Sequence, residues 1–228
     1  MDGAADGRGA FWGRRKGKRL RAAQAGRVED LLPRLRFDPP DLTDPAVLFP
    51  RPVREVWLEI GFGGGEHLLA NARRHPDIGI LGVEPFVNGI AKLLASLEAE
   101  RIDTVRLHDG DATGVLAALP DASLARVDLN YPDPWPKRRH NRRRFVSDDS
   151  LRQMARVLRP GGTFRFVSDI DHYVGWTLAR LLRAPELHWT AEAPGDWREP
   201  FPDWPGTRYE AKALREGRRP SYIAARRA

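Results

Sequence analysis

The chain of 228 residues contains no cysteine, which excludes disulfide bonds and thiolate metal sites. It also lacks an apolar run near the roughly 20 residues of a membrane-spanning helix, and no signal-peptide-like apolar stretch follows its basic N-terminus. The histidines show no spacing typical of metal ligands. We therefore expect a cytoplasmic protein with no metal and no membrane contact; whether it is a monomer or a homodimer stays open.

Acidic residues are almost missing from three stretches that are rich in Lys and Arg. Residues 11–22 and 137–144 each carry six basic residues and no acid, and residues 212–228 carry six with Glu216 as their one acid. The remaining chain is acidic, although the formal net charge is +7. Basic patches favour a polyanionic partner, because each neutralised phosphate releases counterions. A solvated surface without a partner would explain one such patch more easily than three.

The chain divides into two N-terminal segments and one globular domain. Residues 1–36 are rich in Gly, Arg and Ala with little apolar periodicity, which predicts a flexible basic arm. Five prolines between positions 39 and 52 predict an extended linker over residues 37–52. The domain then spans residues 53–228.

Within this domain, apolar strands alternate with amphipathic helices. Predicted strands lie at 56–60, 78–83, 104–107, 124–129 and 163–167, with a further pair near 188–191 and 221–225. Predicted helices lie at 66–74, 87–100, 114–119, 147–158 and 173–182. The alternation predicts an α/β fold with a mostly parallel sheet and helices on both faces, whose ligands bind at the carboxyl ends of the strands.

The first predicted strand runs into a glycine-rich loop that contains Gly61, Gly63 and Gly65. Glycines allow a ligand to approach the backbone closely. A dinucleotide fingerprint would need a third glycine at position 66, where Glu66 would oppose a pyrophosphate, so a nicotinamide-dependent oxidoreductase is the weakest alternative. The spacing from Glu59 to Gly65 instead resembles the first motif of class I S-adenosylmethionine-dependent methyltransferases.

The fourth predicted strand runs into a stiff loop, in which Asp133 lies between two prolines and next to Tyr131 and Trp135. The basic stretch 137–144 follows directly. A rigid carboxylate beside aromatic faces and basic residues indicates a site for a planar base and its phosphates. A Pro-rich loop with a solvated charge run is the simpler alternative.

Residues 132–144 resemble the signature of bacterial tRNA (guanine-N7-)-methyltransferases of the TrmB type, and residues 58–65, 168–171 and 207–210 fit the same family. The resemblance spans residues 53–228 and implies a Rossmann-like class I methyltransferase sheet with an antiparallel C-terminal strand. It implies S-adenosyl-L-methionine contacts at Glu59, Gly61, Gly63, Gly65, Glu84, Asp111 and Asp133. It implies substrate contacts at Lys137, Asp169, Thr207, Arg208, Tyr209 and Glu210.

The implied activity is methyl transfer to N7 of a variable-loop guanine (position 46) in tRNA. N7 carries a lone pair and no proton, so no general base is needed. We expect Asp133 to be the central carboxylate, accepting hydrogen bonds from the guanine edge and offsetting the charge that develops on the ring; Asp169 is a second candidate for that edge. Two alternatives stay open, namely another RNA methyltransferase of the same fold and a non-enzymatic basic RNA-binding protein.

Overall fold

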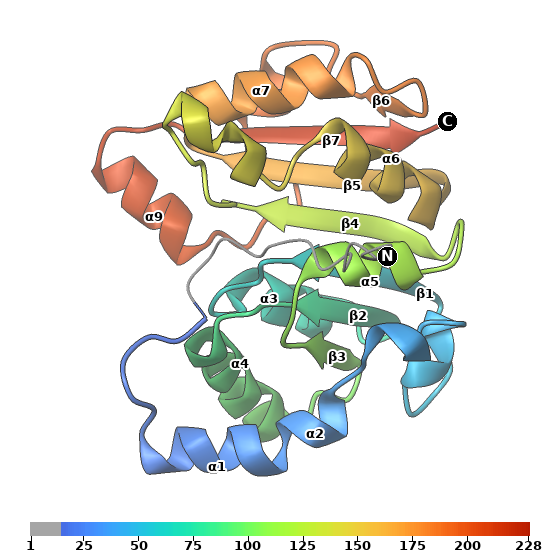
Figure 1. The fold of residues 1–228 in the computed structure, drawn as a ribbon, viewed down its shortest axis with the longest axis vertical. Helices are drawn as coiled ribbons and strands as arrows, with labels where there is room; N and C mark the ends of the chain where they lie inside the picture. The colour runs from blue at the N-terminus through green and yellow to red at the C-terminus, as the bar shows by residue number, and fades with distance from the viewer. Residues whose placement is uncertain (1–14) are drawn as a thin grey trace, which may run out of the picture.

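The computed structural model describes residues 15–228, which form one seven-stranded sheet (Figure 1). Its strands are β1 (Glu55–Ile60), β2 (Ile78–Val83), β3 (Val105–His108), β4 (Leu124–Asn130), β5 (Leu158–Ser168), β6 (Leu187–Trp189) and β7 (Ser221–Arg227). In the order β3-β2-β1-β4-β5-β7-β6, neighbours among β1 to β5 pair in parallel and β7 runs antiparallel to β5 and β6. The predicted fold class, with its antiparallel C-terminal strand, is confirmed.

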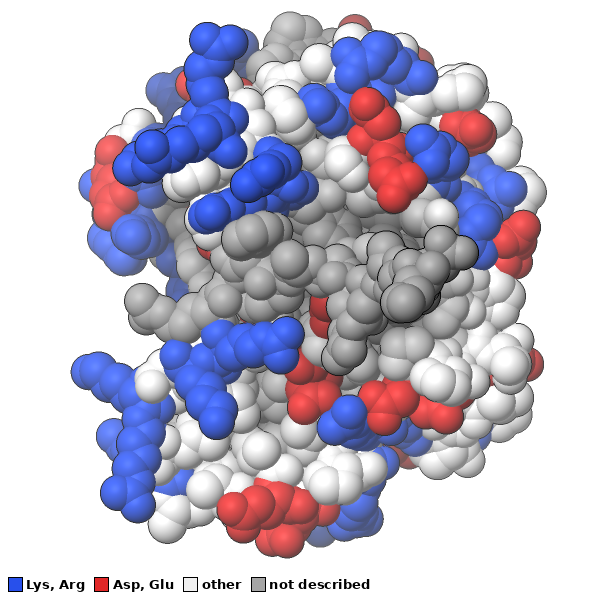
Figure 2. Space-filling model, viewed as in Figure 1, with Lys and Arg blue, Asp and Glu red and all other residues white. Residues whose placement is uncertain are grey.

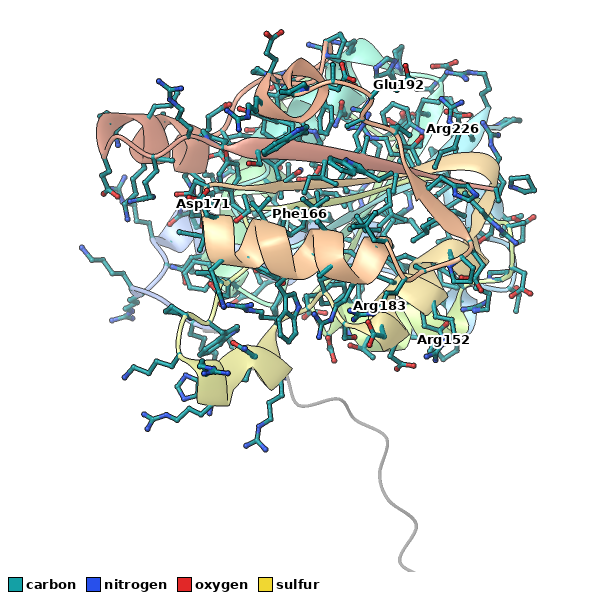
Figure 3. All side chains as sticks on the ribbon, turned by 90° about the horizontal axis from the view of Figure 1, so that it is seen from above. Arg152, Phe166, Asp171, Arg183, Glu192 and Arg226 are labelled. Carbon is teal, nitrogen blue, oxygen red and sulfur yellow. The ribbon has the colours of Figure 1, made fainter. Side chains whose placement is uncertain are left out.

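Helices cover both faces of the sheet, and each face has its own apolar cluster. On one face lie α3 (Glu66–Arg74) and α4 (Val87–Glu100), with α1 (Ala22–Asp30) and α2 (Leu32–Leu35) packed beside them. On the other face lie α5 (Ala112–Ala118), α6 (Asp148–Val157) and α7 (Asp171–Leu181). Figure 3 shows Phe166 of β5 beside α7, where its ring centroid lies 5.3 Å from that of Tyr173.

The elements begin and end where local chemistry favours it. Ser147 is the N-cap of α6, since its hydroxyl accepts a hydrogen bond of 3.0 Å from the amide of Ser150. Asp148 and Asp149 occupy the first turn, where negative charge stabilises a helix. The chain then passes directly into β5 at Leu158, so the glycines at 161 and 162 lie within a strand rather than between elements.

The N-terminal segments differ from the prediction of a flexible arm and an extended linker. Residues 22–35 of the predicted arm form α1 and α2, whereas residues 1–14 lie outside the described residues. The segment 37–52 contains the 3-10 helices η1 (Pro39–Asp41) and η2 (Pro45–Leu48) and buries Phe37, Leu42 and Phe49 in an apolar cluster. Burial of these three side chains makes the Pro-rich segment part of the domain.

The carboxyl ends of β2, β3 and β4 point to one edge of the sheet, on the left in Figure 1. The helix α9 (Arg208–Arg215) and the described N-terminal end of the chain lie at the same edge, while the C-terminus lies at the opposite one. The short helix α8 (Gly195–Arg198) and the segment leading to α9 cover β7. Within residues 15–228, no helix combines the length and apolar character needed to cross a membrane.

Candidate active site

A cleft of about 570 Å³ opens at the carboxyl ends of β1, β2 and β4, where the sequence predicted a ligand site. Of the residues predicted to bind cofactor or substrate, those that line it are Gly61, Gly63, Glu84, Asp111, Asp133 and Tyr209. Glu59, Gly65, Lys137, Asp169, Thr207, Arg208 and Glu210 lie outside its lining. The structure thus brings together the core of the predicted site and leaves the other predicted residues outside the cleft lining.

The glycine loop and the end of β2 are joined by a buried carboxylate. One oxygen of Glu84 accepts a 2.6 Å hydrogen bond from the amide of Gly63, and the other accepts a 2.9 Å bond from the amide of Phe86. Burial raises the pKa of Glu84, although both backbone bonds oppose the rise. Gly63 has φ +56°, and a Cβ there would lie 3.3 Å from the guanidinium of Arg208. A ligand in the cleft therefore meets bare backbone and one anchored carboxylate.

Asp111 lies on the next strand connection and caps α5. Its side chain accepts a 3.2 Å hydrogen bond from the amide of Thr113, and both residues line the cleft. The neutral Gly110 and Ala112 complete this wall. A carboxylate fixed in this way can present its second oxygen to a hydroxyl or amine of a bound ligand.

The loop that carries Asp133 is held in a strained shape. Tyr131 and Trp135 have φ of +49° and +43°, a left-handed conformation that costs free energy outside glycine and persists only where the surroundings impose it. Arg144 supplies part of that support, because its Nε donates a 2.8 Å bond to the carbonyl of Pro134. Asp133 is reached by solvent from the cleft mouth, yet the surrounding atoms desolvate it enough to raise its pKa.

The residues of the motif 207–210 have two different functions: one lines the cleft, and others stabilise the helix α9. Tyr209 lines the cleft and stacks on Tyr131, with ring centroids 6.0 Å apart. Thr207 instead caps α9, because its hydroxyl accepts a 3.1 Å bond from the amide of Glu210. The buried Glu210 accepts hydrogen bonds from the indole of Trp204 and the hydroxyl of Tyr222. Thr207 and Glu210 therefore fix α9 rather than facing the cleft.

Lys137 and Asp169 have other positions in the fold, outside the lining of the cleft. Lys137 is exposed and is the N-cap of η3 (Arg138–Arg143). Asp169 follows β5 and accepts a 2.6 Å bond from Arg218. Asp169 therefore already has a cationic partner in Arg218. Which of the two carboxylates, Asp133 or Asp169, binds the guanine edge stays a prediction.

Glu59 points away from the cleft into a group of buried polar side chains. Its carboxylate lies 2.7 Å from Nδ1 of His67, and the Asp128 carboxylate pairs at 2.8 Å with Arg126. We call the following residues, of which Asn130 and Asp203 are half-buried, the buried polar cluster: Glu59, His67, Asn71, Arg126, Asp128, Asn130 and Asp203. Within residues 15–228, Glu59, His67 and Asp128 are the group whose geometry could suit a metal, but the Arg126 guanidinium already supplies a cation there.

The basic stretch 137–144 contains charges of two kinds. Exposed basic side chains belong to Lys137, Arg138, Arg139 and Arg142. Arg144 is buried, packs over the rings of Tyr173 and Trp176 at 4.9 Å, and holds the Asp133 loop. Figure 2 shows Lys and Arg gathered at the edge that carries the cleft. The third predicted patch is divided, since α9 lies at this edge and Arg226 at the far end of the sheet (Figure 3).

The sequence singled out neither Phe86 nor Asn130 as a site residue, and it placed Arg144 only within the basic stretch expected to contact phosphates. Phe86 and Asn130 line the cleft. Asn130 is the last residue of β4, a position that could have singled it out, whereas Phe86 lies three residues after β2. Arg144 adjoins the apolar pair Phe145 and Val146, and this change of character was the one sign that its side chain turns inward.

Comparisons with known proteins identify the family of this chain. The family model described as "Putative methyltransferase" matches residues 53–222. The chain is 58% identical over 219 residues to the tRNA (guanine-N(7)-)-methyltransferase of Chelativorans sp. (strain BNC1), which covers 94% of this chain and 93% of that protein. It is 57% identical over 219 residues to the protein of that name from Brucella anthropi, covering 95% and 94%.

Solved structures share the fold at low sequence identity. The aminoglycoside resistance methyltransferase NpmB1 matches with a TM-score of 0.51 and 15% identity, covering 77% of this chain and 88% of that one. The 16S rRNA methyltransferase KamB matches with a TM-score of 0.50 and 17% identity, covering 77% and 87%. These likenesses show the fold alone, whereas the two sequence relatives cover nearly the whole chain. The chain therefore belongs to the tRNA (guanine-N(7)-)-methyltransferase family, as its resemblance predicted.

Proposed function

We propose that this protein transfers a methyl group from S-adenosyl-L-methionine to N7 of a guanine in the variable loop of tRNA, at position 46. The observation that carries the proposal is a single cleft that joins the Gly63–Glu84 pair to Asp133 beneath exposed basic residues. The relatives named tRNA (guanine-N(7)-)-methyltransferase support the substrate and the atom. A tRNA substrate also implies a cytoplasmic protein.

The cleft fits S-adenosyl-L-methionine on two observations. Gly61 has φ +72° and no atom within 4 Å of where its Cβ would lie, so the loop leaves open space beside the cleft. The fixed polar groups around that space are the carboxylates Glu84 and Asp111, which suit ribose hydroxyls and positively charged groups better than phosphates. When bound, this cofactor supplies an electrophilic methyl group on a positively charged sulfur.

The chain's own residues then bind and orient the base. The N7 lone pair forms the new bond and the sulfur keeps the electrons of the broken one, so no residue has to remove a proton. Asp133 would accept hydrogen bonds from the guanine N1–H and exocyclic amine and offset the positive charge on the ring. Tyr131 and Tyr209, already stacked on each other, offer an aromatic surface beside it. Orientation of this kind can supply roughly 7–11 kcal/mol of the barrier.

The test is transfer of labelled methyl from S-adenosyl-L-methionine to an unmodified tRNA transcript, followed by nuclease digestion and nucleoside analysis. We expect label in 7-methylguanosine at one variable-loop position. A transcript with adenosine at that position should accept none. Asp121→Asn, an exposed carboxylate near the start of β4, is the matched control and should retain activity. Label in a different nucleoside would contradict the proposed target atom, and tRNA binding without transfer would contradict an enzyme.

A further inference from the structure

His67 is buried at the junction of three segments that shape the cleft. Its side chain is 3% exposed and lies in the second position of α3, directly beneath the glycine loop. Its Nδ1 lies 2.7 Å from the carboxylate of Glu59, two residues before Gly61. The mechanism described above makes no use of this imidazole.

The second segment is the end of β4. The carboxamide of Asn130 lies 3.2 Å from Nδ1 of His67, and Asn130 lines the cleft three residues before Asp133. Its Oδ1 is buried without a hydrogen-bond partner, and within residues 15–228 the His67 ring is the polar group that its Nδ2 approaches to 3.2 Å. The imidazole therefore sets the orientation of a cleft residue that no other described group fixes.

The third segment leads to α9. The ring of Trp204 packs against His67 with centroids 5.0 Å apart, and its indole donates a 2.8 Å bond to Glu210, which belongs to the first turn of α9. The same helix carries Tyr209 into the cleft. A shift of the imidazole would thus reach the glycine loop, the Asp133 loop and α9 together.

The two ring nitrogens face different partners. Nδ1 faces Glu59 and Asn130, which belong to strands that end at the cleft. Nε2 faces the Arg126 guanidinium at 3.3 Å, deeper in the fold, and the Asn71 amide nitrogen lies 3.2 Å from Nε2 and 3.3 Å from Nδ1. Burial lowers the pKa of His67, but the carboxylates of Glu59 and Asp128 outweigh it, so the pKa is raised overall. A proton on Nδ1 matches the bond to Glu59, so Nδ1 donates there and does not accept from Nδ2 of Asn130, whose carboxamide is held by contact with the ring.

We propose that His67 is a positioning residue for methyl transfer: its Nδ1–H holds the end of β1 through Glu59, and its ring packs against the Asn130 carboxamide at the end of β4, which together fix Asp133 relative to the glycine loop. Since His67 touches neither the proposed cofactor nor the base, its effect passes through Asn130 and Glu59. The inference rests on the proposed methyl transfer. The wild-type protein in the same assay distinguishes a failure of the proposed function from a failure of the proposed role of His67. An inactive wild-type protein would overturn the function, whereas an active wild type with an equally active His67 variant would overturn the role.

The test compares His67→Asn with His67→Gln. The amide nitrogen of Asn can replace Nδ1, whereas that of Gln replaces Nε2. We expect His67→Gln to lower kcat on the order of 10²-fold, the effect of a small misplacement distant from the chemistry. His67→Asn should recover most of that loss. The KM for S-adenosyl-L-methionine should stay within about threefold in both variants, since only orientation changes, and calorimetry should give matching affinities without any transfer.

Two further variants separate positioning from folding. Asn130→Ala alone should show the same fall in kcat at constant KM, and adding it to His67→Gln should cause little further loss, because the two residues act as one unit. His75→Gln is the control, since His75 lies at the other end of α3 against Trp57 and should leave kcat unchanged. Equal kcat in His67→Gln and the wild type, additive losses, or losses that follow the unfolding temperature alone would each overturn the proposal.

Discussion

The two faces of the central strands have opposite chemistry. On one face, Leu58 of β1, Leu129 of β4 and Phe166 of β5 join an apolar cluster. On the other face, their sequence neighbours Glu59 and Asp128 are as deeply buried, yet they are charged and paired. Successive side chains of a strand point to opposite faces. A strand of six residues (β1) or eleven residues (β5) can therefore contribute apolar side chains to one face and charged side chains to the other.

The apolar face stabilises the sheet, whereas the charged face positions the residues at its edge. Apolar contacts are non-directional and tolerate small shifts, whereas ion pairs and hydrogen bonds fix particular atoms. The charged face continues to the strand ends, where Asn130 enters the cleft. We therefore expect substitutions on the apolar face to act on stability, and substitutions on the charged face to act on stability and on the alignment of the site.

The largest effect is expected for Asp128→Ala. This substitution leaves the Arg126 guanidinium, which is 5% exposed, without its closest carboxylate. Removing one partner of a buried pair typically destabilises by about 3–5 kcal/mol. Chemical denaturation with a linear extrapolation measures it. Leu58→Ala, on the opposite face and outside the cleft lining, is the matched control, with an expected loss of about 2–5 kcal/mol.

A second variant of the same pair would sharpen the comparison. Replacing both members, Arg126→Met with Asp128→Leu, removes the charges together and can leave stability nearly unchanged. Because Arg126 also lies 3.3 Å from His67 and 3.1 Å from Asp203, we expect methyl transfer to fall in this stable double variant. A double variant with wild-type activity would show that the charged face serves stability only.

Asp133→Ala is expected to have the next largest effect. Loss of one preorganised group that stabilises developing charge typically costs about 2.7–4 kcal/mol, or 10²–10³-fold in kcat. The fold should be kept, since the carboxylate projects from a loop that Arg144 supports through a backbone carbonyl. Thermal unfolding and transfer assays on one preparation measure both. Asp169→Ala is the informative comparison, because an equal loss there would move the central role to the other carboxylate.

Much of the fold could be predicted because the domain alternates strands and helices with clear periodicity. The predicted helices at 66–74 and 87–100 and the strand at 78–83 have the observed bounds. Helix α1 was missed, because its residues bury no side chain fully and its position depends on packing against α4, including a 2.6 Å bond between Arg27 and Glu98. Such tertiary contacts leave no periodic pattern in the sequence.

The site was predictable where function follows from position at a strand end. Glu84 and Asp133 end or follow strands, and both line the cleft. Glu59 could not be placed in the same way, because β1 is buried on both faces and carries no alternation of polar and apolar residues. Its partner His67 belongs to the next helix, and only the packing of α3 on β1 brings the two together.

Glu84 gives a smaller effect with a defined pH dependence. Burial raises its pKa above the ordinary carboxyl range, with the Asp133 charge adding to the rise and Arg208 opposing it. The carboxylate should therefore be lost on acidification at a higher pH than in the unfolded chain, and S-adenosyl-L-methionine affinity should fall through that interval. Since the folded state takes up the proton first, this group's contribution to stability falls as the pH rises through the same interval.

The matched variant is Glu84→Gln, which removes the charge and leaves one acceptor for the two backbone amides of Gly63 and Phe86. We expect it to weaken the cofactor by about 1.5–3 kcal/mol, the usual worth of a hydrogen bond to a charged group. Calorimetry across pH 4 to about 7 would show the wild-type affinity converging on that of the variant at the acidic end. An affinity in the wild type that does not vary with pH would remove Glu84 from the cofactor contacts.

The smallest effect tests whether burial, rather than charge alone, decides what a basic residue does. Arg142 is exposed and Arg144 is buried, although they are two residues apart in one basic stretch. Arg142→Ala should lower tRNA affinity modestly and reduce the slope of log affinity against log salt by about one contact. Arg144→Ala should leave that slope unchanged and lower kcat and stability, because the Pro134 carbonyl and the rings of Tyr173 and Trp176 lose their partner. Filter binding across a salt series decides between the two roles. Equal slopes in both variants would mean that the buried guanidinium of Arg144 also contacts phosphate. Burial would then not distinguish the functions of two basic residues in the same stretch of sequence.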